Sequence, residues 1–274
     1  MALIHQTLAL LQAMLPVLTL IVIFAGIGLV LEWLKPAEPR QPARRILFNL
    51  AYLPVYLISL AVLAPILTSW LPTTSVALLH VSWGQSFLGA LAQTLLFAVI
   101  YDFFYYWWHR AQHTWPALWA IHRLHHSERA LNVTSSARHH WLEETLRPLV
   151  VLLPLAFVLQ LEATQFAVIG TLFAAWPFFI HLNVRLSLGG VGRLIMGPQY
   201  HRVHHSIEPQ HWNRNFGAFF PIWDYLFGTA YHPMADEFPA TGLTEHDGEP
   251  RASAREALTA PFAEWWRLWR DRRQ

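Results

Sequence analysis

The chain has 274 residues, of which 54% are hydrophobic and 13% charged, about half the charged share of an ordinary soluble domain. That composition leaves too little polar surface to cover a soluble globule, and a formal net charge of +2 without a long basic run argues against nucleic-acid binding. The absence of cysteine excludes disulfide bonds, thiolate metal sites, iron–sulfur clusters and cysteine nucleophiles.

Three apolar stretches in the N-terminal part are each long enough to cross a membrane, which takes about 20 residues of helix. The first, Ala13–Val30, carries no charged side chain. No Lys or Arg precedes it, so a cleaved signal peptide is the weaker interpretation. The second stretch is Ile46–Leu71 and the third is Phe87–Trp108.

The basic residues predict the orientation of these stretches. Lys35, Arg40, Arg44 and Arg45 lie in the connector after the first stretch, whereas the loop 72–85 has no Lys or Arg. The positive-inside rule then places the connector and the end of the third stretch on the cytoplasmic side, with the N-terminus outside.

Two further apolar segments, Leu149–Leu161 and Phe166–Ile180, are shorter than a usual membrane span. They form either a fourth and a fifth span, somewhat tilted, or a hairpin that dips into the membrane from one side. We favour the hairpin, because His181 has to return to the other histidines. Residues 189–232 are rich in Gly, Pro and Asn and are expected to form a cytoplasmic cap.

The C-terminal segment 261–273 combines tryptophans with arginines, which is typical either of an amphipathic helix at the membrane interface or of a plain exposed helix end. Together the patterns predict an all-α, polytopic integral membrane protein with about four or five membrane-embedded helices and a cytoplasmic, histidine-rich di-metal cap. We expect a transmembrane region at 1–89, a catalytic region at 90–232 and a cytoplasmic tail at 233–274.

Thirteen of the sixteen histidines lie between His109 and His232, and eight of them form three tight clusters. Spacings of three or four residues place the imidazoles of each cluster on one side of a helix. Neutral imidazoles aimed at one place favour iron, zinc or copper over magnesium or calcium. Eight are too many for one zinc ion and suit two metals, and a redox-active pair of irons would give a membrane enzyme a use for them. The clusters are His109 with His113, His122 with His125 and His126, and His201 with His204 and His205.

Further motifs surround the clusters in a definite order. They are Asp102-x5-Trp108-His109-Arg110-x2-His113, His122-x2-His125-His126-Ser127, Leu131-Asn132-x-Thr134, Arg138-x-His140, His181-x-Asn183, Pro198-Gln199-Tyr200-His201-Arg202-x-His204-His205, Asn215-Phe216-Gly217 and Trp223-Asp224-x-Leu226-Phe227-Gly228-Thr229. Over roughly residues 90–232 this pattern resembles the sterol desaturase / fatty acid hydroxylase superfamily.

The resemblance implies a non-haem di-iron oxygenase of the membrane that acts on C–H bonds of a lipid, with the eight clustered histidines as ligands of two iron ions. O2 would be the co-substrate, and electrons would come from a separate electron-transfer protein or reductant. One departure lies at Arg138-His139-His140-Trp141, where the family often has Arg-x-His-Pro. His140 is therefore the better match to the family histidine, and His139 is the additional one.

Several residues outside the clusters are candidates for the site. His181 is either a ninth ligand or a hydrogen-bonded histidine at the membrane interface, and His140 is a possible ligand or hydrogen-bond donor to one. Asp102 lies two helical turns before His109. A carboxylate in an apolar span needs a partner, so Asp102 either orients a ligand imidazole or pairs with an arginine. The weaker candidates for orienting a ligand are Asn132, Glu128 and Glu143.

The predicted reaction is hydroxylation, or desaturation, of a sterol, a fatty acyl chain or another lipid. The metal centre would carry the difficult step, so no side-chain acid, base or nucleophile is expected. One alternative is a membrane metal transporter or metal-storing protein, although transporters place ligands near the bilayer midplane and these clusters lie at the ends of spans. A zinc hydrolase is a further alternative, but it would want a Glu where Arg110 follows His109.

Overall fold

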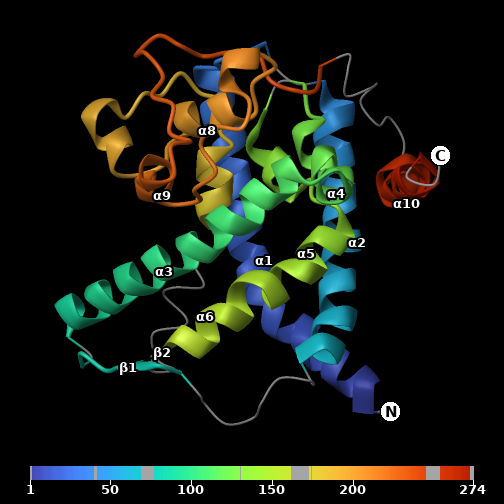
Figure 1. Cartoon of the computed structure of the whole chain (residues 1–274), viewed down its shortest axis with the longest axis vertical. Helices are drawn as coiled ribbons and strands as arrows, with labels where there is room; N and C mark the ends of the chain where they lie inside the picture. The colour runs from blue at the N-terminus through green and yellow to red at the C-terminus, as the bar shows by residue number, and fades with distance from the viewer. Residues whose placement is uncertain are drawn as a thin grey trace.

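The computed structural model describes residues 2–39, 42–68, 77–84, 86–129, 131–161, 173, 175–244 and 254–271, and the statements below concern these residues. The described chain is mostly helical, as the sequence predicts, with one small sheet. In Figure 1 the N-terminus and strand β1 (Leu79–Val81) lie at one end of the molecule. The short helices between residues 189 and 226 lie at the other end.

The first two apolar stretches form the long helices α1 (Ala2–Leu34) and α2 (Ala43–Thr68), which run along the long axis of the molecule (Figure 1). Residues 69–71 of the predicted second stretch lie outside the described part of the chain. Large apolar side chains of these helices point outward instead of into a core. They include Val22, Ile23, Ile27, Val30, Leu34 and Leu47, each at least half exposed.

The third stretch forms α3 (Phe87–Thr114), which continues past the predicted end at Trp108 and carries the first histidine pair. Ser86 begins the helix, because its Oγ accepts a hydrogen bond from the Gly89 N–H at 3.1 Å. Among the described residues, α3 is the one helix long and apolar enough to cross a membrane by length and composition. The chain turns at Trp115 into α4 (Pro116–His126), whose first-turn proline has no N–H to satisfy.

The chain between α4 and residue 161 consists of short elements, and the predicted apolar segment Leu149–Leu161 is not one continuous helix. These elements include the 3₁₀ helix η1 (Val133–Ala137), α5 (Trp141–Arg147), the π-helical turn η2 (Pro148–Leu152) and α6 (Leu153–Val158). Strand β2 (Leu159–Leu161) then pairs in parallel with β1, with Leu79 opposite Leu159. Residues 162–172 and 174, where the predicted hairpin would turn, lie outside the described residues.

The cap consists of short elements joined by turns, as the Gly- and Pro-rich sequence predicts. They are the 3₁₀ helix η4 (Gly189–Arg193), α8 (Pro198–His204), the 3₁₀ turn η5 (Pro209–His211) and α9 (Ile222–Leu226).

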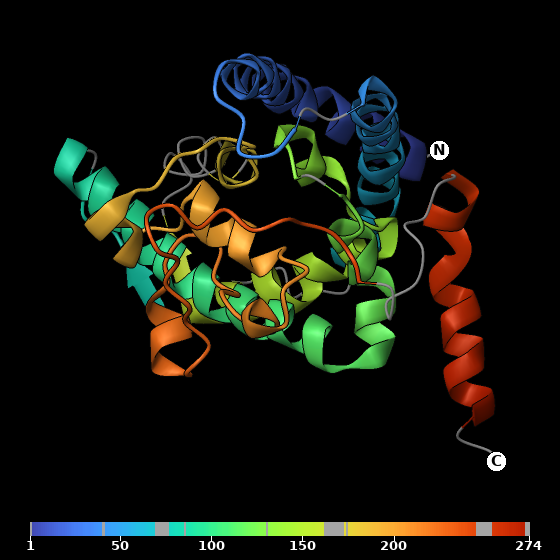
Figure 2. The same cartoon turned by 90° about the horizontal axis from the view of Figure 1, so that it is seen from above.

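The C-terminal segment forms α10 (Ala254–Asp271), which is seen end-on in Figure 1 and at full length in Figure 2. Its axis is thus roughly perpendicular to that of α2. An apolar core fills the space between α3, α4, α6 and the cap. Its buried members are Tyr101, Trp108, Ile121, Val151, Leu155, Leu159 and Phe219.

Candidate metal centre

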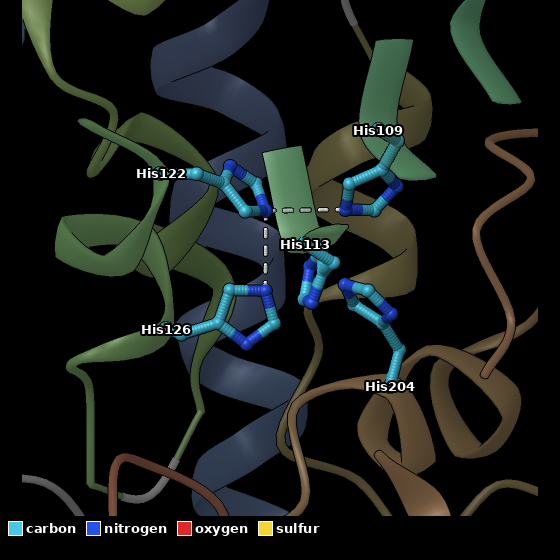
Figure 3. Close-up of side chains that lie close together, drawn as sticks. All are labelled: His109, His113, His122, His126 and His204. Carbon is cyan, nitrogen blue, oxygen red and sulfur yellow. Dashed lines mark hydrogen bonds between the residues drawn. The ribbon is translucent and has the colours of Figure 1, made fainter. Parts of the chain in front are cut away.

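Five histidines from three helices form the first cluster. Helix α3 contributes His109 and His113, α4 contributes His122 and His126, and α8 contributes His204. Each pair is separated by four residues, so both imidazoles leave the same face of their helix. One nitrogen of each ring lies within 4.8 Å of those of the others, and Figure 3 shows the five rings turned toward a common centre.

A second cluster lies beside the first and contains His125, His181, His201 and His205. The Nε2 atom of His181 lies 3.1 Å from that of His125 and 3.1 Å from that of His201. The Nε2 atom of His205 lies 3.1 Å from that of His201. All four residues are at least 97% buried. The structure therefore brings together the eight clustered histidines of the sequence and adds His181 as the ninth member.

The two His-x-x-His-His segments each serve both clusters. On α4 the outer pair, His122 and His126, faces the first cluster, and the middle His125 faces the second. At α8 the assignment is reversed, since His201 and His205 belong to the second cluster and His204 to the first. The rings of His126 and His205 stack with their centroids 4.2 Å apart where the clusters meet.

Hydrogen bonds fix which nitrogen of several rings carries the proton. His109 donates from Nδ1 to the carbonyl oxygen of Phe216 at 2.8 Å, and His122 donates from Nδ1 to Glu143 Oε1 at 2.9 Å. In neutral imidazoles the two Nε2 atoms then carry lone pairs, yet they lie 3.2 Å apart. Facing lone pairs repel each other unless a cation lies between them. Ligand nitrogens about 2.0–2.1 Å from a metal are about 2.9–3.4 Å apart, so the observed spacing fits a bound metal ion.

The same inference follows from nitrogens that have no protein partner. His204 donates from Nδ1 to the Arg214 carbonyl at 2.8 Å, whereas its Nε2 is buried without a hydrogen-bond partner. The Nε2 atom of His113 is buried and unpartnered in the same way. A buried polar atom without a partner costs free energy, and a metal ion would satisfy both nitrogens.

Four of the clustered imidazoles on α4 and around α8 have lowered pKa values and are neutral at neutral pH. Burial, followed by the neighbouring imidazoles, lowers the pKa of His126, His201 and His205 well below its usual value. Burial lowers the pKa of His204 to about 3. Neutral imidazole is the form that binds metals, so these histidines need lose no proton to do so.

Glu143, on α5, orients His122 by accepting its Nδ1 proton. Burial alone would raise the pKa of Glu143, but His122 and His139 beside it hold that pKa well below its usual range. Glu143 is therefore ionised and is a strong acceptor for the ligand imidazole. The sequence ranks Glu143 among the weaker candidates, because nothing in a linear pattern joins it to a histidine 21 positions earlier in the chain.

The sequence predicts that His140 belongs to the site and that His139 is the additional histidine, whereas in the structure His139 lies against the clusters and His140 lies away from them. His140 is the N-cap of α5. Its Nδ1 accepts from the Leu142 N–H, and its Nε2 lies 3.2 Å from the Leu258 carbonyl, so both nitrogens are engaged away from the clusters. His139 instead stacks on His125 with ring centroids 4.1 Å apart. Burial opposes the charged form of His139, but the carboxylates of α5 raise its pKa.

Asp102 has neither of its predicted partners. Its carboxylate accepts hydrogen bonds from the backbone N–H groups of Ala218, Phe219 and Phe220, at 2.6, 3.2 and 2.8 Å. It therefore holds the loop whose Phe216 carbonyl accepts the proton of His109. Asp102 influences the cluster through this loop and not by contact with an imidazole.

Asp224 supports the same loop from the other side. Its carboxylate accepts from the N–H groups of Phe216 and Gly217 at 2.8 and 2.9 Å. A Cβ at Gly217 would lie 2.5 Å from the Phe220 carbonyl oxygen, so this tight turn requires glycine.

The remaining candidates connect elements around the site. Asn132 is the N-cap of η1 and accepts from the Thr134 N–H at 3.0 Å. Glu128 joins α2 to the end of α4, because it accepts from Arg45 at 3.0 Å and from Asn49 at 3.3 Å. These contacts give both residues structural roles at the edge of the site.

Comparison with known proteins identifies the family to which this chain is similar. The family described as fatty acid hydroxylase matches residues 94–229, which contain all nine clustered histidines. Alkylglycerol monooxygenase of Danio rerio is 31% identical over 188 residues, 69% of this chain and 38% of that protein. The ornithine lipid hydroxylase OlsE of Rhizobium tropici is 32% identical over 152 residues, 56% of this chain and 46% of that protein.

This chain belongs to the sterol desaturase / fatty acid hydroxylase superfamily. A further superfamily member, methylsterol monooxygenase 1-3 of Arabidopsis thaliana, is 26% identical over 180 residues, 59% of each protein. The chain spans less than half the length of the first two relatives. No solved structure matches it. The predicted superfamily is thus confirmed, and its histidine clusters are able to bind metal.

Proposed function

We propose that this chain is a membrane-embedded di-iron oxygenase that hydroxylates a C–H bond of a lipid. The single observation that carries the proposal is the pair of adjacent clusters in which imidazole Nε2 atoms face one another at 3.1–3.2 Å. The relatives described above are named for oxidising alkylglycerols, ornithine lipids and methylsterols, which are all lipids. The lipid class is therefore part of the proposal.

The first cluster would hold one iron and the second cluster the other. When bound, the iron pair supplies O2 reduction and C–H oxidation. The balance is one C–H, one O2, two electrons and two protons giving one C–OH and one water, with the electrons from an external protein or reductant. The neutral imidazoles among these ligands would leave most of the positive charge of a bound iron pair uncompensated.

The chain's own residues orient and protect this centre. Glu143 and the carbonyls of Phe216 and Arg214 hold ligand protons on Nδ1 and so direct Nε2 inward. Burial of the second cluster excludes water from that half of the site. Hydroxylation is preferred, and desaturation would require loss of a second hydrogen from the same substrate.

The proposal includes a multi-pass membrane topology with both clusters on the cytoplasmic side. Three observations support it. The described residues 35–39 and 42–45 of the basic connector and the clusters lie toward the same end of α1 and α2 (Figure 1). Apolar side chains of both helices face outward. Helix α10 runs across the direction of α2 and exposes Phe262, Trp266 and Trp269 on one stripe, as expected of an interfacial helix.

The proposal is tested by metal analysis and lipidomics. The purified full-length protein should contain two iron ions per chain and consume O2 when a reductant and lipid extract are added. Lipids of cells that express the chain should gain one oxygen relative to cells that express His125→Ala, whereas loss of two hydrogens would indicate desaturation. Full turnover by His125→Ala with normal iron would contradict the assignment of the second cluster.

Transport or storage of metal receives no support from the family match. An oxygenase and a metal transporter also differ in whether the bound iron exchanges. An oxygenase should keep iron through repeated buffer changes and turnover. A transporter in sealed proteoliposomes should carry iron across the membrane, and such flux without O2 consumption would overturn the proposed function.

A further inference from the structure

A cavity of about 230 Å³ lies in the cap, and none of the nine clustered histidines lines it. Its walls come from residues 186–193, from the start of α8 and from the segment 232–235. Pockets that take drug-sized ligands have roughly 300–1,000 Å³. This smaller cavity therefore suits the headgroup of a lipid and not the whole lipid.

Hydrogen bonds between remote segments hold the walls of this cavity in place. Gln199, on α8, is 5% exposed and donates from Nε2 to the Met234 carbonyl at 2.7 Å. Tyr225, on α9, donates from Oη to the Arg193 carbonyl at 3.2 Å, and the same oxygen lies 2.5 Å from His232 Nε2. Helices α8 and α9 thus fix two walls of the cavity, which is a built feature of the cap.

The charge of the lining is positive and uncompensated. Among the described residues that line the cavity, Arg193 is the one with a charged side chain, and there is no Asp or Glu. Arg193 is exposed, and its guanidinium has no ion pair or hydrogen bond within the described part of the chain. Tyr200 also belongs to the lining, and its Oη is buried without a hydrogen-bond partner. An arginine fork of this kind binds phosphate oxygens through two N–H groups.

Large apolar side chains next to the lining residues are exposed. Val191 and Leu194, on either side of the lining residue Arg193, are 54% and 71% exposed. Met234, between two lining residues, is 70% exposed, and Leu226 of α9 is 64% exposed. We call these four apolar residues the rim. A soluble anion would leave the rim in water, whereas a lipid with its headgroup in the cavity would cover it with acyl chains.

This side of the cap lies against the helix that the proposed function places in the membrane. Trp223, on α9, donates from Nε1 to the Val99 carbonyl of α3 at 3.2 Å, and its ring centroid lies 4.9 Å from that of Phe103. Figure 1 shows α9 at the edge of the cap next to α3. A bilayer around α3 would therefore bring lipid within reach of the rim.

We propose that the cap cavity binds the phosphate of an anionic phospholipid, whose acyl chains cover the rim. The inference rests on the membrane topology of the proposed function and adds a lipid site separate from the metal centre. Because no clustered histidine lines the cavity, a lipid held here is not presented to the iron pair but attaches the cap to the bilayer. The lining has no carboxylate to compensate an ammonium group, so phosphatidylglycerol should bind better than phosphatidylcholine.

The absence of cysteine allows a thiol-protection experiment with the full-length protein in detergent. Ala235→Cys introduces a unique thiol at an exposed position of the cavity wall, and Gln210→Cys, exposed elsewhere in the cap, is the control. Maleimide labelling is measured with dioctanoyl phosphatidylglycerol, dioctanoyl phosphatidylcholine or glycerol 3-phosphate. At about ten times its Kd, phosphatidylglycerol should slow labelling of Ala235→Cys roughly tenfold. The other two compounds at the same concentration should slow it little, and Gln210→Cys should respond to none.

Two matched pairs of variants, each combined with Ala235→Cys, assign the protection to the cavity. Arg193→Gln should raise the Kd for phosphatidylglycerol about tenfold, because the phosphate loses charge-assisted hydrogen bonds. Arg267→Gln, at an exposed position on α10, should leave that Kd unchanged. A Cβ at Gly190 would meet no other atom within 4 Å, so both Gly190→Ala and Gly190→Asp should fold. The added carboxylate should abolish protection, and the added methyl group should preserve it.

Equal protection by the two phospholipids, or an unchanged Kd in Arg193→Gln, would overturn the proposal. Equal protection by glycerol 3-phosphate would assign the cavity to a soluble phosphate ester and so overturn the lipid site. Labelling requires neither iron nor turnover. Protection in a protein that holds no iron would therefore support the lipid site while contradicting the proposed oxygenase. An active, iron-loaded protein without protection would do the reverse.

Discussion

At the scale of single residues, the centre depends on nitrogens that face away from it. His109, His122, His181 and His204 each direct Nδ1 to an oxygen acceptor and Nε2 to a cluster. Three of these acceptors are backbone carbonyls, and only Glu143 is a side chain. Substitution of Glu143 is thus the direct way to alter a ligand's orientation without removing the ligand.

Glu143→Gln should lower iron affinity about 10–100-fold, because His122 loses an ionised acceptor that increases its basicity. The fold should persist, since an amide oxygen can still accept the Nδ1 proton. Chelator competition followed by metal analysis measures the effect. Glu208→Gln, at a position in the cap where the side chain is 42% exposed, is the control. Equal retention of iron by the two variants would contradict the orienting role.

Asp102→Asn should reduce stability by about 1–3 kcal/mol, because one oxygen of a buried acceptor for three N–H groups becomes a donor. Iron retention should fall with it, since the loop carries the Phe216 carbonyl. Thermal unfolding in detergent and iron content are measured together, with the exposed Asp236→Asn as control. Loss of iron without loss of stability would indicate direct contact with the metal ligands instead.

The sequence predicts the members of the clusters better than the residues that support them. Histidine spacing on a helix is a local pattern, so all eight clustered histidines could be recognised from sequence, and His181 could be named as a candidate. Glu143 and the carbonyl acceptors come from segments remote in sequence. The choice between His139 and His140 depended on where α5 begins, which spacing alone does not determine.

At the scale of elements, α4 carries three of the nine clustered histidines, and neighbouring segments contact this helix on both sides. Arg138 donates to the Leu124 carbonyl and to Ser127 Oγ at its C-terminal end. Helix α10 packs along α4, where Trp265 donates to the Ala117 carbonyl at 2.8 Å. Helix α10 thereby fixes the position of a helix that carries clustered histidines and with which it shares no sequence pattern.

Arg123 of α4 and Glu264 of α10 form an ion pair at 2.7 Å. This pair allows the energetic coupling between the two helices to be measured. Both side chains are 16% exposed, so the pair should contribute more than a fully exposed one, roughly 1 kcal/mol. A double-mutant cycle of Arg123→Ala and Glu264→Ala, read from unfolding in detergent, gives the interaction energy. Strictly additive single effects would show that α10 and α4 are not coupled through this pair.

The long helices were predictable from composition, and the small sheet was not. Long runs of apolar residues, without charge in the first two and with Asp102 alone in the third, identify α1, α2 and α3 directly. Strands β1 and β2 have three residues each, too few to show a periodic pattern, and their pairing joins segments about eighty residues apart. The apolar pattern therefore predicts that Leu159–Leu161 ends a membrane-embedded segment, whereas these residues form strand β2.

At the scale of the whole molecule, the proposed topology predicts which surfaces face each side of the membrane. Ser82, near strand β1, should lie outside and Arg44, at the start of α2, inside. In sealed right-side-out vesicles an impermeant maleimide should label Ser82→Cys at once and Arg44→Cys only after permeabilisation. The reverse order would invert the topology, and immediate labelling of both would argue against a membrane-spanning arrangement.

The shared use of each His-x-x-His-His segment has a consequence for how the centre assembles. An ion bound by His122 and His126 fixes the helix that also presents His125 to the other ion. The first ion thus removes part of the ordering entropy that the second would otherwise oppose. Iron titration of the metal-free protein should accordingly be positively cooperative, with few singly loaded molecules. The active centre would then exist either complete or empty, which limits half-loaded species that could release reduced oxygen into the membrane.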